Sequence, residues 1–183
     1  MAKMRADAHR NRERLLDAAT AAFAAADGTV VSLEAIARDA GVGIGTLYRH
    51  FPNREALIEA VYRTELAEVS ASAAELLEHH PPVTALRHWM NRYASFVAAK
   101  QGMAESLAAL FAAGRLEPND TRSSIVGAVN TLLNAGAADG SLRSDVAAAD
   151  VVSSLLGIAI ASHSGEQAQR MRALLVDGLV LKR

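Results

Sequence analysis

The chain has 183 residues, a formal net charge of −1 and no cysteine, and 51% of its residues are apolar. The lack of cysteine excludes disulfides and thiolate metal sites, and the apolar content is too high for a disordered chain. Because phosphate affinity depends on where cations lie, nucleic-acid binding would have to come from local clusters. One such cluster stands at the N-terminus: Lys3, Arg5, Arg10, Arg12 and Arg14.

We expect neither a targeting segment nor a membrane span. The N-terminus is charged and lacks the apolar run of a signal peptide. The longest stretches without a charged residue, 123–138 and 151–165, have 16 and 15 residues. A spanning helix needs about 20 apolar residues, so both are expected to be buried helices of a cytoplasmic protein.

The apolar residues recur at helical spacing, and alanine and leucine dominate the composition. These features predict an all-α protein. We expect about nine helices, with the following ranges: 8–26, 33–40, 44–51, 53–79, 83–100, 103–113, 121–138, 146–162 and 166–181.

Glycine, proline and capping residues indicate where several helices begin and end. Asp27-Gly28 and Gly41 are expected to end the first two helices, since glycine adopts the left-handed conformation readily. Ser32, Asn53 and Asp145 are predicted to cap the N-termini of the helices that follow them. Prolines are expected to stop the helices before Pro52 and Pro81-Pro82, and Pro118 to lie in a polar loop.

The last two predicted helices suggest a surface for self-association. The segment VVSSLLGIAIA, residues 151–161, is apolar nearly all round, which indicates burial on two sides. We therefore expect both helices to pair with their copies in a homodimer, although burial within one monomeric core would also explain the pattern. The predicted interface consists of Val152, Leu155, Leu156, Ala159, Met171, Leu175 and Leu179.

Residues 32–54 have the spacing of a helix-turn-helix. That motif needs a small residue where its helices cross, a turn residue tolerant of positive φ, and a buried residue on the second helix. Ala37, Gly41 and Leu47 fill these positions. We expect a helix-turn-helix domain over residues 1–54 and a helical domain over 55–183, with the fourth helix joining them.

The motifs around this segment resemble the DNA-binding domain of the TetR family of bacterial transcriptional regulators. The resemblance covers residues 14–62, and residues 74–114 are similar, more loosely, to the C-terminal domains of SbtR-like TetR proteins. It rests on the following pieces: Leu15-Leu16-Asp17-Ala18-Ala19, Phe23, Gly28, Ser32, Ile36-Ala37, Ala40-Gly41-Val42, Gly45-Thr46-Leu47-Tyr48-Arg49-His50-Phe51 and Arg54-Glu55-Ala56-Leu57.

The resemblance implies that the third helix enters the major groove of double-stranded DNA. It would expose Gly43, Ile44, Gly45, Thr46, Tyr48, Arg49 and His50. Thr46, Tyr48 and His50 would contact phosphates or base edges, while Ser32 and Arg54 would hold phosphates at helix N-termini. Arg49 is the best candidate for reading a guanine, because its guanidinium can donate to O6 and N7 together.

One position departs from the family pattern. Gly43 stands where the family commonly has a serine that caps the third helix, so no hydroxyl is available there. Structural roles also remain open: Leu47 and Tyr48 could pack the three-helix core, and His50 could be a core histidine. The N-terminal arginines could bind phosphates or form a solvated tail.

TetR-like regulators are implied to be homodimers whose C-terminal domain binds a small-molecule effector. Binding would tilt the fourth helix and release a repressor from a palindromic operator. The candidate walls of the effector pocket are Trp89, Tyr93, Phe96, Met103, Leu107, Phe111 and Asn130, with Val126 and Leu133 beside them. We expect Asn130 to be a buried amide.

We expect no enzymatic activity, cofactor or metal. The sequence contains no G-x-S-x-G, phosphate loop or H-E-x-x-H motif. His79 and His80 end a helix, where they suit its dipole, although with Glu78 and His88 they could suggest a metal. The alternative to a regulator is a helical small-molecule-binding or protein-interaction module with a vestigial helix-turn-helix.

Overall fold

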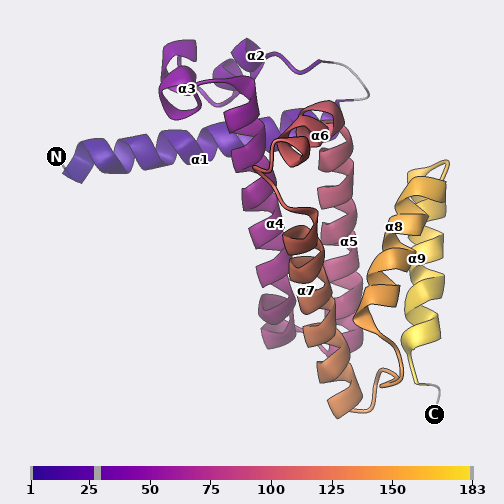
Figure 1. The fold of residues 1–183 in the computed structure, drawn as a ribbon. Coiled ribbons are helices and arrows are strands. Elements are labelled where there is room, and N and C mark those ends of the chain that lie inside the picture. The colour runs from indigo at the N-terminus through magenta and orange to yellow at the C-terminus, as the bar shows by residue number, and fades with distance from the viewer. Residues whose placement is uncertain (1, 27–29, 182–183) are drawn as a thin grey trace. The chain divides into compact units, whose positions relative to one another are not determined.

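The protein is helical, as predicted. In the computed structural model, which describes residues 2–26 and 30–181, the only β feature of those residues is an isolated bridge between Leu142 and Val180. The helices of the described residues, shown in Figure 1, are α1 Ala2–Ala25, α2 Leu33–Asp39, α3 Ile44–His50, α4 Arg54–His79, α5 Pro82–Gln101, α6 Ala104–Ala112, α7 Pro118–Ala138, α8 Ala148–Ala161 and α9 Gly165–Leu179. The predicted stop at Asp27-Gly28 lies outside the described residues.

Two predicted helix starts are wrong. Pro118 opens α7 instead of lying in a loop, because proline is well suited to the first turn, where its missing N–H is not needed. Asp145 does not cap α8: Ala147 occupies the N-cap position. The Asp145 carboxylate instead accepts two hydrogen bonds from Arg143, at 2.6 and 2.7 Å.

The chain forms two compact units. The first contains Met1–Glu65 and Ala98–Glu117, and the second contains Leu66–Val97 and Pro118–Arg183. In this grouping α4 and α5 each contribute residues to both units, and the division into functional domains after Arg54 stays a prediction. The sequence could not indicate that residues 98–117 belong with the N-terminal helices, since that grouping depends on packing far along the chain.

In the first unit, α1 lies against α2 and α3. The inner face of α1 contributes Leu15, Ala19 and Phe23, each with no exposed surface. The turn between α5 and α6 comes so close to α1 that a Cβ on Gly102 would stand 2.0 Å from the carbonyl oxygen of Phe23. Glycine is therefore required at position 102, because any side chain would collide with backbone.

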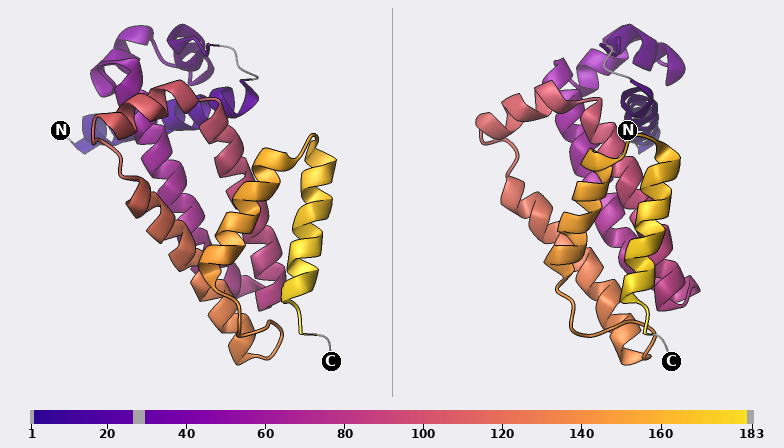
Figure 2. Two further views of the ribbon diagram at one scale, coloured as in Figure 1. Left: turned by 45° about the vertical axis from the view of Figure 1, so that its right-hand side comes forward. Right: turned by 90° about the vertical axis from the view of Figure 1, so that its right-hand side faces the viewer.

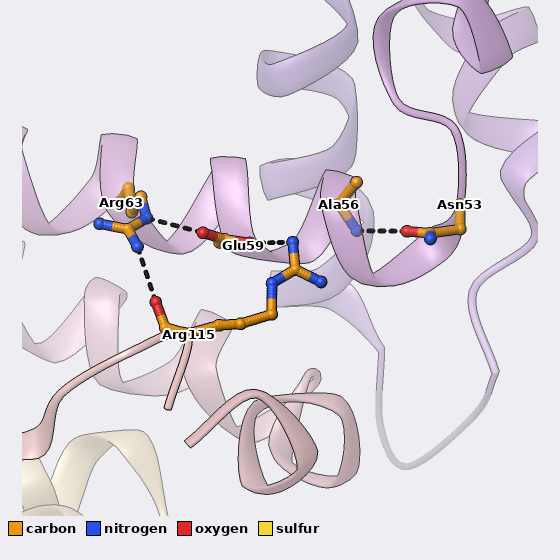
Figure 3. Close-up of polar contacts among 5 residues, drawn as sticks. All are labelled: Asn53, Ala56, Glu59, Arg63 and Arg115. Atoms are coloured by element: carbon orange, nitrogen blue, oxygen red, sulfur yellow. Dashed lines mark hydrogen bonds and ion pairs between the residues drawn. The ribbon is translucent and has the colours of Figure 1, made fainter. Parts of the chain in front are cut away.

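A polar cluster ties α4 to the segment after α6, also within the first unit. The Glu59 carboxylate accepts a hydrogen bond from Arg63 Nε at 3.0 Å and another from the Arg115 guanidinium (Figure 3). Arg63 also donates to the Arg115 carbonyl oxygen at 2.7 Å. Near the start of the same helix, Asn53 Oδ1 accepts from the Ala56 N–H at 2.8 Å, which confirms the predicted cap.

In the second unit, α7 packs on α8, and α8 lies side by side with α9 (Figure 2). The core of this unit includes Trp89, whose side chain has no exposed surface and whose indole N–H donates to the Val69 carbonyl oxygen at 2.8 Å. The Trp89 and Tyr93 rings stack, with centroids 5.4 Å apart. Within the described residues, no helix is both long and apolar enough to cross a bilayer.

Candidate nucleic-acid interface

The helix-turn-helix is built by a tight turn between α2 and α3. Gly41 has a φ of 66°, a left-handed conformation that favours glycine, as predicted. The Val42 N–H donates to the Ala37 carbonyl oxygen at 2.9 Å, which closes the end of α2. Leu47, with no exposed surface, anchors the inner face of α3 to the core, so the predicted core role of Leu47 is confirmed.

The outer face of α3 is open to solvent. Ile44 is 37% exposed and Tyr48 is 46% exposed. A Cβ placed on Gly43 or Gly45 would meet no atom within 4 Å. Thr46 and His50 are half-buried. The inner side of α3 is thus fixed, and its outer side offers small and apolar groups to a partner.

Arg49 is exposed, and its guanidinium makes hydrogen bonds within α3. Its Nε donates to the Gly45 carbonyl oxygen at 3.2 Å, and one terminal nitrogen donates to Thr46 Oγ1 at 2.9 Å. The guanidinium therefore lies back along α3. To read a guanine it would exchange these acceptors for base O6 and N7, an exchange that roughly conserves the number of hydrogen bonds.

Ser32 caps α2, as predicted. Its hydroxyl oxygen accepts from the Ala35 N–H at 3.2 Å, and the hydroxyl donates to Glu34 Oε2 at 2.8 Å. The hydrogen bond from Ser32 lowers the pKa of the Glu34 carboxyl. A phosphate contact by Ser32 remains a prediction, and it would have to compete with Glu34 for the hydroxyl proton.

Arg54 has a structural role that the sequence did not reveal. A terminal nitrogen of its guanidinium donates to the Val31 carbonyl oxygen at 2.6 Å, and its Cζ lies 5.7 Å from the centre of the Phe23 ring. Arg54 thus ties the start of α4 to the residue before the α2 cap and to α1. The phosphate clamp predicted for Arg54 remains a prediction, with the other guanidinium N–H groups as its donors.

The N-terminal arginines are partly engaged within the chain. Arg10 pairs with Asp7, and Arg14 donates to Asn11 Oδ1 at 2.5 Å. The Arg12 Cζ lies 5.5 Å from the centre of the buried Phe51 ring, a cation–π contact that holds α1 to the end of α3. Phosphate binding by this N-terminal cluster stays a prediction.

Two family models match the chain. One, described as bacterial regulatory proteins of the tetR family, matches residues 15–61, and the other, the C-terminal domain of SbtR-like transcriptional regulators, matches residues 81–181. The chain belongs to the TetR family. The predicted resemblance to TetR proteins, including the SbtR-like character of the C-terminal part, is therefore confirmed.

Solved TetR structures have the same fold. A TetR transcriptional regulator from Streptomyces coelicolor is 44% identical, with 94% of this chain and 99% of that one covered and a TM-score of 0.85. A TetR regulatory protein from Mycobacterium vanbaalenii is 33% identical, with 97% and 99% covered and a TM-score of 0.76. An HTH-type transcriptional regulator from Staphylococcus aureus is 38% identical over 63 residues, and the match spans 34% of its length.

The predicted effector-pocket residues of this TetR protein are divided between the two units. Trp89, Tyr93, Phe96 and Asn130 belong to the second unit, whereas Met103, Leu107 and Phe111 belong to the first. Asn130 is exposed, so the expectation of a buried amide at that position is wrong. The sequence pattern of α7 is compatible with either a buried or an exposed position for Asn130. The packing of neighbouring helices against α7 determines which of the two it takes. An effector pocket among the other residues remains a prediction.

The predicted dimer residues fall on two different sides of α8 and α9. Val152, Leu155 and Leu179 are at most 6% exposed within the single chain, so they serve its own core. Leu156 is 43% exposed, and Ala159, Met171 and Leu175 are intermediate. The two most exposed large apolar side chains of α8 and α9 were not among the predicted interface residues: Ile160 is 74% exposed and Leu174 is 72% exposed.

The histidine pattern near the end of α4 gives a ring contact. The His80 and His88 rings lie edge to face, with centroids 4.6 Å apart. In the described part of the chain, no three histidine, aspartate or glutamate side chains gather as ligands for a metal ion.

Proposed function

We propose that this TetR-family protein is a homodimeric, cytoplasmic repressor that binds a palindromic operator through α3 and leaves it when a small molecule binds the C-terminal domain. The outer face of α3 carries this proposal. It exposes Ile44, Tyr48 and Arg49 on a helix whose inner side Leu47 holds in the core. An apolar side chain can contact a thymine methyl group, and an arginine can read a guanine.

The outward side of α8 and α9 supports the homodimer. At 100° per residue, Leu156 and Ile160 share one side of α8, and Leu174 and Gly178 share one side of α9. Ile160 and Leu174 leave apolar surface in water that a second copy would cover. Two copies would place two α3 helices on half-sites roughly 34–36 Å apart.

The alternative function is a small-molecule-binding or protein-interaction module whose helix-turn-helix is vestigial. This chain has the glycine turn at Gly41, the buried Leu47 and open space around Gly43 and Gly45, which together form an intact helix-turn-helix with room for a partner at α3. These features favour the DNA-binding function.

Selection of bound sequences from random duplex DNA tests the proposal. We expect enrichment of an inverted repeat whose half-sites lie about one helical turn apart, and an affinity that falls steeply as salt rises. A flat salt response with no enriched sequence would overturn the proposal in favour of the alternative module.

Replacement of Arg49 by alanine tests whether this residue recognises a base of the operator. We expect the variant to lose preference for one guanine in each half-site, at about 1–3 kcal/mol of discrimination. Arg122→Ala, which removes the same charge from an exposed position on α7, serves as the matched control. An operator preference unchanged by Arg49→Ala would remove this residue from base recognition.

A further inference from the structure

Lysine is scarce in this chain, and a single lysine lies far from the chain ends. The sequence has 19 Lys and Arg residues together, and only Lys3, Lys100 and Lys182 are lysine. Lys100 stands in the last turn of α5, within the first unit. A lysine amine can lose its proton when it is buried, whereas a guanidinium stays charged. Lys100 therefore brings to a half-buried position a chemistry that arginine could not supply.

The Lys100 side chain belongs to a stack that joins three helices of the first unit. Its Nζ lies 5.8 Å from the centre of the Phe111 ring. The Phe111 ring meets the Tyr62 ring edge to face, with centroids 5.9 Å apart. Because these side chains come from α5, α6 and α4, a change at Lys100 can reach the helix that follows the helix-turn-helix. Phe111 was predicted as a wall of the effector pocket, whereas Lys100 was not predicted.

The Lys100 amine is partly withdrawn from water but is still reachable. Burial lowers the pKa of this amine, so a larger fraction of it is neutral than for a lysine in water. In the described part of the chain, the side-chain atoms with neither a hydrogen-bond partner nor accessible surface are Ser70 Oγ and Arg172 Nε. Lys100 Nζ is not among them, although its contact is with the Phe111 ring and not with a hydrogen-bond acceptor. The nitrogen therefore remains open to solvent.

A neutral, half-buried amine beside an aromatic ring suits reaction with a small carbonyl compound. Lysine amines that are desolvated form Schiff bases with carbonyl groups. The chain has no cysteine, so no thiol competes for an electrophile. An aldehyde loses only water in this reaction, and a small aldehyde reaches a partly covered nitrogen more easily than a bulky acyl thioester does. An apolar substituent on the aldehyde could lie against the Phe111 ring.

We propose that Lys100 is a covalent sensor for small apolar aldehydes. The neutral amine attacks the aldehyde carbon and a C–N bond forms. The carbonyl oxygen then leaves as water with the two hydrogens of the amine, and a C=N double bond remains. No electron is gained or lost, and hydrolysis reverses the reaction. The proposal names a chemical class for the effector, and it rests on the proposed function only for its effect on DNA.

The packing of the α5–α6 turn explains how an adduct would act on the helix-turn-helix. A Cβ on Gly102 would stand 2.0 Å from the carbonyl oxygen of Phe23 in α1, so the turn has no room to move toward α1. A group added to Lys100 must instead displace Phe111, against which Tyr62 packs. Tyr62 is 1% exposed, and its displacement would shift α4. We therefore expect the adduct to weaken DNA binding.

The reaction is tested on the full-length protein without DNA. Butanal is added with sodium cyanoborohydride, which reduces the imine to a stable butylamine, and peptide mass spectrometry identifies the labelled lysines. We expect Lys100 to be labelled several times faster than Lys3 and Lys182, the internal controls, because more of its amine is neutral. In denaturing urea the three rates should converge, since the burial is lost. Equal rates in the folded protein, or slower labelling of Lys100, would overturn the proposal.

A second experiment tests whether the adduct acts on DNA binding. We expect protein treated with butanal and cyanoborohydride to bind duplex DNA more weakly than protein treated with cyanoborohydride alone. Lys100→Arg keeps the positive charge but forms no imine, so its DNA binding should not respond to butanal. Lys182→Arg, the matched control, should respond as the unchanged protein does. A response that persists in Lys100→Arg, or no response in protein labelled at Lys100, would overturn the sensor role.

The two experiments separate this inference from the proposed function. Protein that binds no DNA before treatment would contradict the proposed function and leave the labelling result at Lys100 intact. Protein that binds DNA but is not labelled preferentially at Lys100 would contradict the sensor alone. If Lys100→Arg does not fold, the labelling of the unchanged protein still decides.

Discussion

Neither backbone conformation nor packing within the chain requires glycine at the two positions, 43 and 45, at the start of α3. Neither Gly43 nor Gly45 has a positive φ, and a Cβ at either position would meet no atom of the chain within 4 Å. Gly41, by contrast, needs its φ of 66° to make the turn. Glycine inside a helix costs about 1 kcal/mol relative to alanine, so Gly45 weakens α3 without aiding its packing. Close approach of the α3 backbone to DNA would explain why it is retained.

Replacement of Gly45 by alanine should therefore separate stability from binding. We expect the free energy of unfolding to rise by up to about 1 kcal/mol, because alanine favours the helix. We expect operator affinity to fall, since the added methyl group would occupy space at the DNA surface. Urea denaturation and DNA titration measure the two effects. Gly127→Ala on α7 is the matched control, because a Cβ there is equally unobstructed, and it should stabilise without altering DNA affinity. A Gly45→Ala variant that binds DNA as tightly as the unchanged protein would contradict the close approach.

Local roles of single residues could be predicted from the sequence, but contacts with distant residues could not. The caps at Ser32 and Asn53 and the turn at Gly41 depend on neighbours only a few positions away, and the structure confirms all three. The bond from Arg54 to the Val31 carbonyl and the folding of Arg49 onto Thr46 depend on side-chain rotamers. Sequence spacing does not determine these.

Between elements, the Glu59 cluster is one polar tie of the first unit. The Glu59 side chain is only 18% exposed, and it accepts hydrogen bonds from the guanidiniums of Arg63 and Arg115. Charge-assisted hydrogen bonds in partly buried positions are stronger than exposed ion pairs. The cluster should therefore hold α4, which continues from the helix-turn-helix, to the segment that follows α6.

A double-mutant cycle between Glu59→Gln and Arg115→Met measures this tie. We expect Glu59→Gln to lower the free energy of unfolding by about 1–2 kcal/mol, with a coupling energy of at least about 0.5 kcal/mol. The same cycle for Glu75 and Arg92, an ion pair 61% and 49% exposed, serves as the control and should give less. Equal coupling in both cycles, measured by urea denaturation, would mean that the partial burial of Glu59 adds nothing.

The predicted dimer surface illustrates a limit of helical periodicity as a guide to packing. Residues 151–161 are apolar nearly all round. The pattern therefore predicts a helix but does not predict which side of that helix faces the core. Val152 and Leu155 were expected to face a second copy, but they are buried by their own chain. Packing of α7 on one side of α8 determines which residues remain outside, and that packing depends on residues far away in sequence. Ile160 and Leu174 emerge as the exposed positions only in the folded chain.

For the whole molecule, the central expectation is that two weak half-site contacts act together. The net charge of −1 gives a single copy little general attraction to DNA, so one α3 helix should bind a half-site weakly. Linking two copies makes the second contact intramolecular and can raise affinity by a factor of about 100 to 10,000 without new contacts. Operator binding should thus depend strongly on the α8 and α9 surface, although that surface itself would touch no DNA.

Replacement of Ile160 by glutamate tests this dependence. Ile160 is 74% exposed in the single chain, so the fold should tolerate the charge, whereas a charge at the buried Leu155 should unfold the protein. We expect Ile160→Glu to be monomeric by light scattering. It should bind the full palindrome at least about 100-fold more weakly and bind an isolated half-site as before. Asn134→Glu, which places the same side chain at an exposed position on α7, should remain dimeric. If Ile160→Glu stays dimeric, a different surface joins the copies; if it is monomeric yet binds the palindrome unchanged, recognition does not require the pair.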